Sequence, residues 1–426
     1  MPKYRPNEAG ENVPCVAAGS WTASAGRGRL FSVPIPQRIG DFLQRRQDIV
    51  RLVQWGCVAF YLFVLLAPVF MPLPAVVIVR ELWWPAVILA TLLCGQFWCG
   101  LLCPDGTLTE FISRHGRAGK IPLNLRWFGW PLLAFSIITM AEHLLGAHRS
   151  PVAILVLLGG ASLAAWATGY FLGRGKRIWC RYLCPAGSMF ALLARGAMFH
   201  YRVDRAAWDA APRPLPRPVD CPQLLDVRRL RSNEKCNMCG RCSGHRNAVV
   251  LSLRIPGQEI AALREEEADP RDAFAICFVL IGLCYGVAYG QASPFGSGLL
   301  TGAAAVLLTA AALGTSVAAL LCLGAAGRIR RAALLAHGLI PLAGIGLFLS
   351  TLEYVKGILA QSVINTLAWV SWLRIPLLLA GSAWAIAIGL VMVTRLEATP
   401  CCRALAAVAY ILALSLVATC YLLAPL

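Results

Sequence analysis

Charge is scarce in this chain of 426 residues: Asp, Glu, Lys and Arg together make up 14% of it, whereas apolar residues make up 58%. A soluble globular domain carries about a quarter charged residues, so this composition excludes an ordinary soluble protein. The mean hydropathy of +0.65 points the same way. We therefore expect most of the chain to lie in a membrane.

Histidine is also rare, with six residues, and the chain has no Cys-x2-Cys-His segment. The lack of that segment excludes a covalently attached c-type haem. No pair of histidines lies deep in the apolar segments, so the sequence does not indicate axial haem ligands. Residues 1–50 contain Arg, Pro and Gly but no apolar run of suitable length, and we expect no N-terminal signal peptide.

Nine apolar segments approach the ~20 residues that a helix needs to cross a bilayer. They are residues 52–72, 83–103, 127–146, 151–172, 273–291, 297–323, 332–352, 370–393 and 404–424. The sequence thus predicts an all-α polytopic membrane protein with about nine transmembrane helices. Four regions follow: an N-terminal tail (1–50), a four-helix membrane core (51–200), a non-membrane segment (201–272) and a five-helix C-terminal region (273–426).

Basic residues outnumber acidic ones, 39 to 21, and the net charge is +18. With the N-terminus in the cytoplasm, the outer connections hold only four basic residues: Arg80, Arg149, Lys356 and Arg374. Cytoplasmic connections carry the excess of Lys and Arg, so this placement is a topology signal. We expect a cytoplasmic-membrane protein with the C-terminus outside, lipid as a partner and no nucleic-acid partner.

A duplicated motif ends two of the apolar segments. Residues 98–106 read Trp-Cys-Gly-Leu-Leu-Cys-Pro-Asp-Gly, and residues 179–187 read Trp-Cys-Arg-Tyr-Leu-Cys-Pro-Ala-Gly. In the predicted topology the second and fourth helices both run inward, so the motifs share the cytoplasmic face. The sequence therefore predicts one site built from the thiols of both copies: Cys99, Cys103, Cys180 and Cys184.

Three interpretations of these thiols compete. A shared iron–sulfur cluster needs four thiolates, and two copies supply them. A thiol–disulfide relay needs only one pair and more often uses Cys-x2-Cys, and buried helix-end cysteines need no ligand at all. The first interpretation is favoured because chance rarely copies Trp, Pro and Gly together with the cysteines. A disulfide framework is disfavoured because the cytosol keeps thiols reduced.

A second cysteine group lies in the non-membrane segment. Its three thiols are spaced like the start of a bacterial ferredoxin run: Cys236, Cys239 and Cys242. Arg246 stands where the fourth cysteine is expected. Cys221, which a proline follows, is the preferred fourth ligand, and His245 is the competing one. An iron–sulfur cluster is the favoured metal group, with a Cys3His zinc site as the alternative.

The twin motifs followed by this cysteine group resemble the NapH/MauN type of membrane ferredoxin, whose relatives include the nitrous-oxide-reduction regulator and the cytochrome oxidase accessory protein. The resemblance covers about residues 40–255. It implies two [4Fe-4S] clusters, a ferredoxin-like cytoplasmic segment, and electron transfer between the quinone pool and another redox protein. Three features depart from it: the ferredoxin run is incomplete, no outer flavin-binding domain is present, and helices five to nine lack a counterpart in the simplest relatives.

The expected function is membrane-bound electron transfer, with quinol oxidation as the leading reaction and an unidentified redox protein as partner. An assembly or regulatory factor that uses iron–sulfur chemistry for metal reduction or redox sensing is the alternative. His143 and His148 are weaker candidates, as proton acceptors from quinol, against the plainer interpretation of interfacial histidines. Nearby arginines are expected to stabilise the reduced clusters: Arg181, Arg241 and Arg246.

Overall fold

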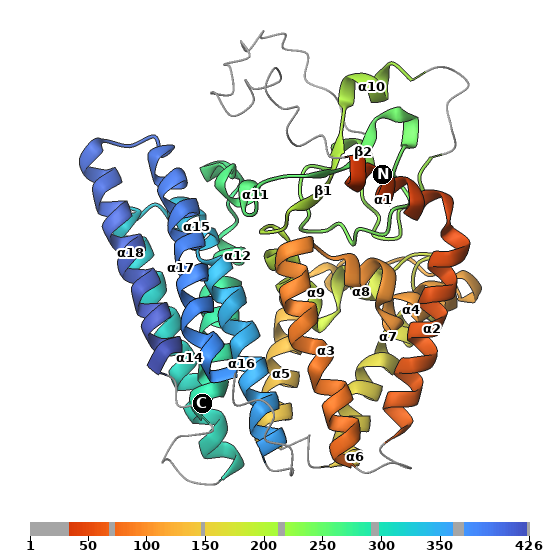
Figure 1. Cartoon of the computed structure of the whole chain (residues 1–426), viewed down its shortest axis with the longest axis horizontal. Coiled ribbons are helices and arrows are strands. Elements are labelled where there is room, and N and C mark those ends of the chain that lie inside the picture. The colour runs from red at the N-terminus through yellow and green to blue at the C-terminus, as the bar shows by residue number, and fades with distance from the viewer. Residues whose placement is uncertain are drawn as a thin grey trace.

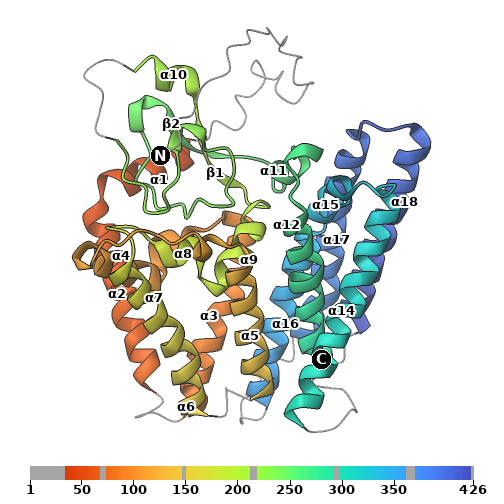
Figure 2. The same ribbon diagram turned by 180° about the vertical axis from the view of Figure 1, so that it is seen from behind.

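A computed structural model describes residues 34–67, 73–145, 150–211, 218–290, 298–360 and 370–423. Two groups of helices stand side by side, and a smaller non-membrane layer lies over one end of the first group (Figure 1). The view from behind shows the same two groups, with α5 of the first facing α14 of the second (Figure 2). The cysteine motifs lie where the first group meets the non-membrane layer.

The first group is the membrane core. Its long helices are α2 (Gln47–Leu66), α3 (Leu73–Cys94) and α5 (Gly129–Leu144), followed by the continuous run α6 (Pro151–Ile154), π-helical η6 (Leu155–Gly159) and α7 (Gly160–Phe171). Short elements follow α3 and α7 and carry the motifs. They are η3 (Trp98–Leu102), α4 (Pro104–His115), α8 (Ile178–Tyr182) and α9 (Pro185–Ala194).

The second group begins with α12 (Pro270–Phe274), the π-helical η10 (Ala275–Leu283) and α13 (Cys284–Gly290). It continues with α14 (Leu299–Gly324), α15 (Ile329–Gly338), α16 (Ile340–Ala360), α17 (Val370–Thr394) and α18 (Pro400–Leu423). Its interior is apolar and fully buried at positions such as Leu335, Leu339 and Ala343. Helix α16 packs against α3, so one continuous hydrophobic core joins the two groups.

Within the described residues, five helices are long and apolar enough to cross a membrane. They are Gln47–Leu66, Pro270–Ala288, Leu299–Gly324, Trp372–Thr394 and Pro400–Leu423; α15 and α16, bent by 52° at their junction, form a sixth if counted as one span. This result confirms a multi-pass helical membrane protein, and the count of nine stays a prediction. The segment predicted at 83–103 ends as a helix at Cys94, because Gly95 takes a φ of 86°.

The non-membrane layer contains a strand pair that the all-α prediction lacked. Strand β1 (Phe199–Val203) pairs antiparallel with β2 (Val249–Leu253), with Tyr201 opposite Leu251. The pair closes the segment between them, and its buried side chains form a small core with Cys236 and Met238. The remaining elements here are α1 (Pro34–Arg45), α10 (Arg205–Asp209), α11 (Gln258–Ala261) and the 3-10 turns Asn124–Arg126, Val227–Arg229, His245–Asn247 and Glu265–Glu267.

Two Arg-rich connections of the second group lie at the same end as this layer. Arg331 Nε donates to Glu265 Oε2 at 3.3 Å, and Arg395 donates to the Ala261 carbonyl at 2.8 Å. Both bonds tie connections between helices to the chain that follows β2. The cysteine motifs and these arginines therefore share one end of the helices, as the predicted topology requires.

We expect replacement of glycine by alanine to have different effects on stability at two positions. An added Cβ at Gly286 of α13 would lie 2.6 Å from the Val306 carbonyl oxygen of α14, whereas Gly160 has open space around it. Gly286→Ala should lower the thermal midpoint in detergent, because forcing packed helices apart costs about 1–3 kcal/mol. Gly160→Ala should leave the midpoint unchanged or raise it, since Ala favours helix by about 1 kcal/mol. Equal midpoints would contradict the close α13–α14 contact.

Candidate functional site

Both copies of the Trp-Cys motif fold in the same way. The Cys103 N–H donates to the Trp98 carbonyl at 2.8 Å, and the Cys184 N–H donates to the Trp179 carbonyl at 2.9 Å. A proline follows each cysteine as the first residue of α4 or α9, where its fixed φ suits a helix start and no N–H is needed. The second cysteine of each motif therefore stands at the N-terminus of a helix.

The glycine of each motif allows close wrapping around the cysteines. The Gly106 N–H donates to Cys103 Sγ at 3.5 Å, and an added Cβ at Gly106 would lie 3.0 Å from the Arg177 guanidinium. In the second copy, a Cβ at Gly187 would lie 3.3 Å from the Cys180 carbonyl. Backbone N–H groups at a helix N-terminus carry partial positive charge, which favours a thiolate there.

The four thiols of the duplicated motif lie together, and we call them the first cysteine set. Burial, followed by the charge of the Cys184 thiol, raises the pKa of Cys180 to about 12. Burial likewise raises the pKa of Cys103 and of Cys184 to about 12, and the pKa of Cys99 well above its usual value, with the other three thiols adding to the rise. Since metal ligation requires thiolates, a bound group must supply the compensating positive charge.

The second cysteine set comprises Cys221, Cys236, Cys239 and Cys242. All four line one cavity. The loop that carries three of them turns through positive φ angles at Met238 (55°) and Gly240 (80°). Gly240 is also required for space, because an added Cβ would lie 2.5 Å from the Leu43 side chain of α1.

The structure separates the two candidates for the fourth position of this set. Cys221 lines the cavity, and its charge contributes to the raised pKa of Cys242, after the effects of burial and of Cys236 and Cys239. His245 instead packs its ring against Trp208, with ring centroids 5.0 Å apart. Burial, and then the charge of Arg246, lower the pKa of His245. Cys221 is thus the residue that lies beside the other three.

Buried donors without partners lie at both sets. The Tyr201 hydroxyl and the Asn237 side-chain N–H2 line the cavity of the second set and have no hydrogen-bond partner. Near the first set, the Arg177 guanidinium nitrogen Nη2 is also buried without a hydrogen-bond partner. Buried donors normally have acceptors, so these positions fit an anionic group rich in sulfide and thiolate. Among the described residues, no three His, Cys, Asp or Glu side chains have the geometry of a single-ion site.

A buried ion-pair network lies between the two sets. Arg177 donates from Nε to Glu110 Oε2 at 3.0 Å, and Arg241 donates to Glu110 Oε1 at 2.6 Å. Glu110 is 4% exposed and Arg177 is 1% exposed. Burial alone would raise the pKa of Glu110, but the two guanidinium groups outweigh it and lower the pKa to about 2.

The same network holds the two sets against each other. Arg177 Nη1 donates to the Cys99 carbonyl at 2.7 Å, and the Arg177 backbone N–H donates to the Pro222 carbonyl at 2.9 Å. Gly100, next to Cys99, touches the backbone of the second set directly, since an added Cβ would overlap the Asn237 carbonyl oxygen. The two sets are therefore neighbours through backbone contact.

Some predicted residues lie elsewhere. His143 stands in the last turn of α5, with Nδ1 2.8 Å from the Thr139 carbonyl oxygen, about 20 Å along the helix from its cysteine-side end. His148 lies outside the described residues. Of the predicted arginines, Arg241 joins the network, whereas Arg246 lies over the Trp208 ring at 4.8 Å and Arg181 over the Tyr182 ring at 5.8 Å.

Sequence reasoning missed Glu110 and Arg177. The available signal was their position: Arg177 precedes the second Trp-Cys pair by two residues, and Glu110 is one of two acidic residues in the helix after the first Cys-Pro. Neither position reveals its partner, because the two residues are 67 apart in the chain.

Comparisons with known proteins match the core. A family model described as "4Fe-4S binding domain" matches residues 77–122 and 155–202, which are the two copies of the motif-bearing unit. Protein NirI of Paracoccus denitrificans is 28% identical over 181 residues, covering 37% of this chain and 26% of the relative. Regulatory protein NosR of Pseudomonas aeruginosa is 25% identical over 184 residues, covering 37% of this chain and 25% of the relative.

An uncharacterized protein of Methanocaldococcus jannaschii is 29% identical over 126 residues, covering 28% of this chain and 49% of the relative. The chain thus spans about a quarter of the length of NirI and NosR. No solved structure matches it.

Fold and site together define a multi-pass membrane protein with a 4Fe-4S binding core. The matches agree with the resemblance seen in the sequence: the core of this chain is similar to a 4Fe-4S binding domain and to parts of NirI and NosR.

We expect removal of the buried charge at Glu110 to destabilise the protein far more than removal of a comparable exposed one. Glu110→Gln leaves Arg177 buried without its counter-charge, and breaking a buried pair costs about 3–5 kcal/mol. The matched control is Asp209→Asn, which breaks the solvent-exposed pair with Arg228 and should have little effect. Denaturation midpoints in detergent check this, and a Glu110→Gln midpoint equal to that of the control would contradict the role given to the network.

Proposed function

We propose that this protein is a membrane-bound electron carrier that holds two [4Fe-4S] clusters. The first cysteine set would ligate one cluster, and Cys221, Cys236, Cys239 and Cys242 the other. The observation that carries the proposal is the backbone contact between Gly100 and Asn237, next to the cysteines of the two sets. Two clusters held in adjacent loops are placed to exchange electrons.

The clusters, when bound, supply one-electron redox chemistry. The chain's own residues do the rest. Arg177 and Arg241 place two buried positive charges beside eight thiolates, and Glu110 holds both guanidinium groups in place. Helix N-termini at Cys103 and Cys184 add partial positive charge. These charges favour the reduced, more negative state of a cluster.

The rest of the proposal concerns topology and partners. We place the N-terminus and both cysteine sets on the cytoplasmic side, with nine spans, a ferredoxin-like segment at 201–272 and the C-terminus outside. The shared end of the Arg-rich connections supports this orientation. Electrons would come from the quinol pool, through a quinol dehydrogenase reaction, and leave to a redox protein.

A second function is favoured by one comparison. The relative from Pseudomonas aeruginosa carries the name "Regulatory protein". A regulatory or assembly factor would use the same clusters to sense redox state or to reduce a metal during maturation of a respiratory enzyme. Purified clusters that a quinol reduces would favour the electron carrier, whereas clusters that only a strong chemical reductant reduces would favour the second function.

Iron content tests the two-cluster proposal. Protein purified without oxygen in detergent should be brown and contain about eight iron atoms per chain, four for each cubane. A matched variant with Cys103→Ser should retain about half of the iron. Colourless protein that contains zinc would overturn the proposal.

A pair of single substitutions tests the fourth ligand of the second cluster. Cys221→Ser should remove the electron paramagnetic resonance signal of one reduced cluster and leave the other, because Cys221 lines the cavity of the second set. His245→Ala should leave both signals unchanged, because its ring packs on Trp208. The reverse pattern would assign the ligand to His245.

A further inference from the structure

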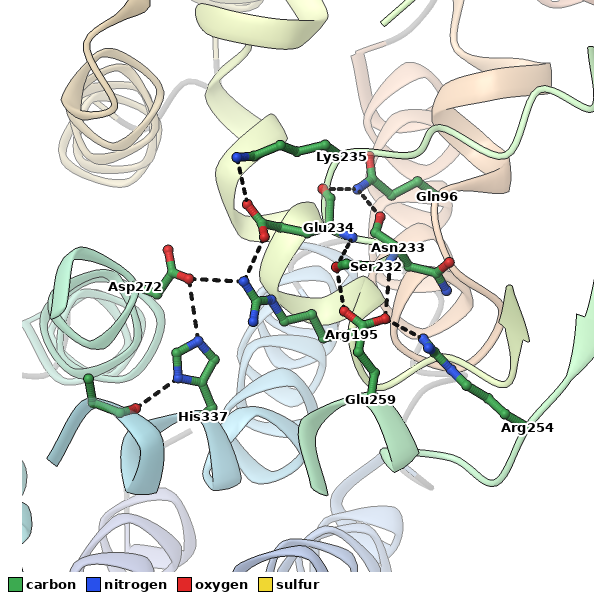
Figure 3. A network of polar contacts seen from close by, with 11 residues as sticks. Gln96, Arg195, Ser232, Asn233, Glu234, Lys235, Arg254, Glu259, Asp272 and His337 are labelled. Carbon is green, nitrogen blue, oxygen red and sulfur yellow. Dashed lines mark hydrogen bonds and ion pairs between the residues drawn. The ribbon is translucent and has the colours of Figure 1, made fainter. Parts of the chain in front are cut away.

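A second, larger cavity lies between the membrane core and the second group of helices. It has a volume of about 440 Å³ and is lined by residues of α5, α9 and α12, together with Cys180 of the first cysteine set. Arg195 of α9, Asp272 of α12 and His337 of α15 converge at this junction (Figure 3). The cavity therefore joins a proposed cluster ligand to the helices that the matched family segments do not include.

His337 lies within hydrogen-bond distance of Asp272. His337 Nδ1 lies 2.8 Å from the Ala333 carbonyl oxygen, which only accepts, so Nδ1 carries a hydrogen. His337 Nε2 lies 3.3 Å from Asp272 Oδ2. A hydrogen bond between these two atoms joins the ring to the carboxyl group.

The pair is arranged with its carboxylate toward the cavity. His337 is fully buried, whereas the Asp272 side chain is 26% exposed and lines the wall. Arg195 also donates to Asp272 Oδ2, at 3.1 Å. Both partners use the same oxygen, as Figure 3 shows, so Oδ1 is left to face a ligand.

Unpartnered buried donors mark the same wall. Arg195 is 6% exposed, and its Nε has no hydrogen-bond partner. Arg181 NH1 and Ser188 Oγ are also buried without partners, and both residues line the cavity. Leaving such groups unsatisfied costs free energy, so these donors fit the oxygens of a bound molecule.

The cavity wall also has an apolar part at the level of the membrane surface. Phe128 and Leu132 line it from the start of α5. Phe128 and its neighbours Trp127 and Trp130 are exposed, as aromatic side chains at a membrane–water interface are. A ligand that reaches this cavity from the bilayer surface would have an apolar portion, oxygen atoms for the donors, and a proton for Asp272.

We infer that this cavity is the quinol site of the protein and that Asp272 is its proton acceptor. The inference rests on the proposed electron-transfer function. A quinol loses two electrons and two protons as both O–H bonds break. One proton would go to Asp272 Oδ1 and the other to solvent in the cavity, and the clusters that the two cysteine sets would hold would each take up one electron. His337 is a positioning residue that holds the carboxylate.

Asp272→Asn tests the acceptor in intact protein carrying its clusters. The variant should be bleached by decylubiquinol at least about a hundredfold more slowly than the wild type, because an amide cannot accept the proton. Bleaching by dithionite should be unchanged, which shows that the clusters are present. Glu266→Gln is the matched control: it removes an exposed acidic side chain of the neighbouring turn that does not line the cavity, and should bleach at the wild-type rate.

His337→Leu separates positioning from binding. Leucine leaves Asp272 without the hydrogen bond from His337 that holds its carboxylate. Binding of 2-heptyl-4-hydroxyquinoline N-oxide, followed by fluorescence quenching, should stay within about threefold of the wild type, while the maximal bleaching rate falls at least about tenfold. A merely structural role would change binding and rate together.

The outcomes distinguish the inference from the function on which it rests. An Asp272→Asn variant that decylubiquinol bleaches at the wild-type rate overturns the inference and leaves the clusters in place. Wild-type protein that dithionite bleaches but that neither binds the N-oxide nor reacts with decylubiquinol also overturns it. Wild-type protein without iron overturns the proposed function itself.

Discussion

The buried ion pair between Arg177 and Glu110 holds the functional part of this protein together. Glu110 comes from the helix after the first motif, Arg177 precedes the second motif, and Arg241 lies between two cysteines of the second set. Such a pair rarely adds net stability over apolar packing, because desolvating both charges is costly. Its value lies in specificity: a buried Arg finds its full set of partners only when all three segments are in register. Charge balance for two sets of thiolates follows from the same arrangement.

A second polar network attaches the C-terminal helices to this core. Arg195 binds Glu234 at 2.6 Å and Asp272 at 3.1 Å, so one guanidinium links α9, the second cysteine loop and α12. Gln96 donates to the Glu234 carbonyl at 2.8 Å and extends the network to the first motif. Position 195 of the second copy corresponds to Arg114 of the first, which binds Glu110 at 2.6 Å. The duplicated unit thus uses the corresponding arginine twice, each time in an ion pair with a glutamate.

The segments that match known proteins cover only part of the region in which the structure brings polar residues together. The 4Fe-4S binding domain matches only the two motif-bearing units, and NirI and NosR are aligned over about a quarter of their length. Asp272 and His337 lie outside the matched units, on helices whose role the sequence left open. In the proposed function, the matched units hold a cluster and the C-terminal helices complete the site where its electrons arrive. The C-terminal helices would then determine which electron donor binds, whereas the matched units would determine which metal group is held.

What the sequence determined by itself was local. The apolar runs, the twin Trp-Cys-Pro-Gly motifs and the Cys236 group are each read from neighbouring residues, since helix propensity, proline at a helix start and ligand spacing act over a few positions. Tertiary structure decided the rest: Cys221 rather than His245 beside the second set, the Arg177–Glu110 pair, the end of α3 at Cys94, the β1–β2 pairing and the meeting of Asp272 with His337. Most of these features join residues far apart in the chain. A lone acid or histidine in an apolar segment shows that a partner is needed, but only packing of the helices identifies which distant side chain is close enough to be that partner.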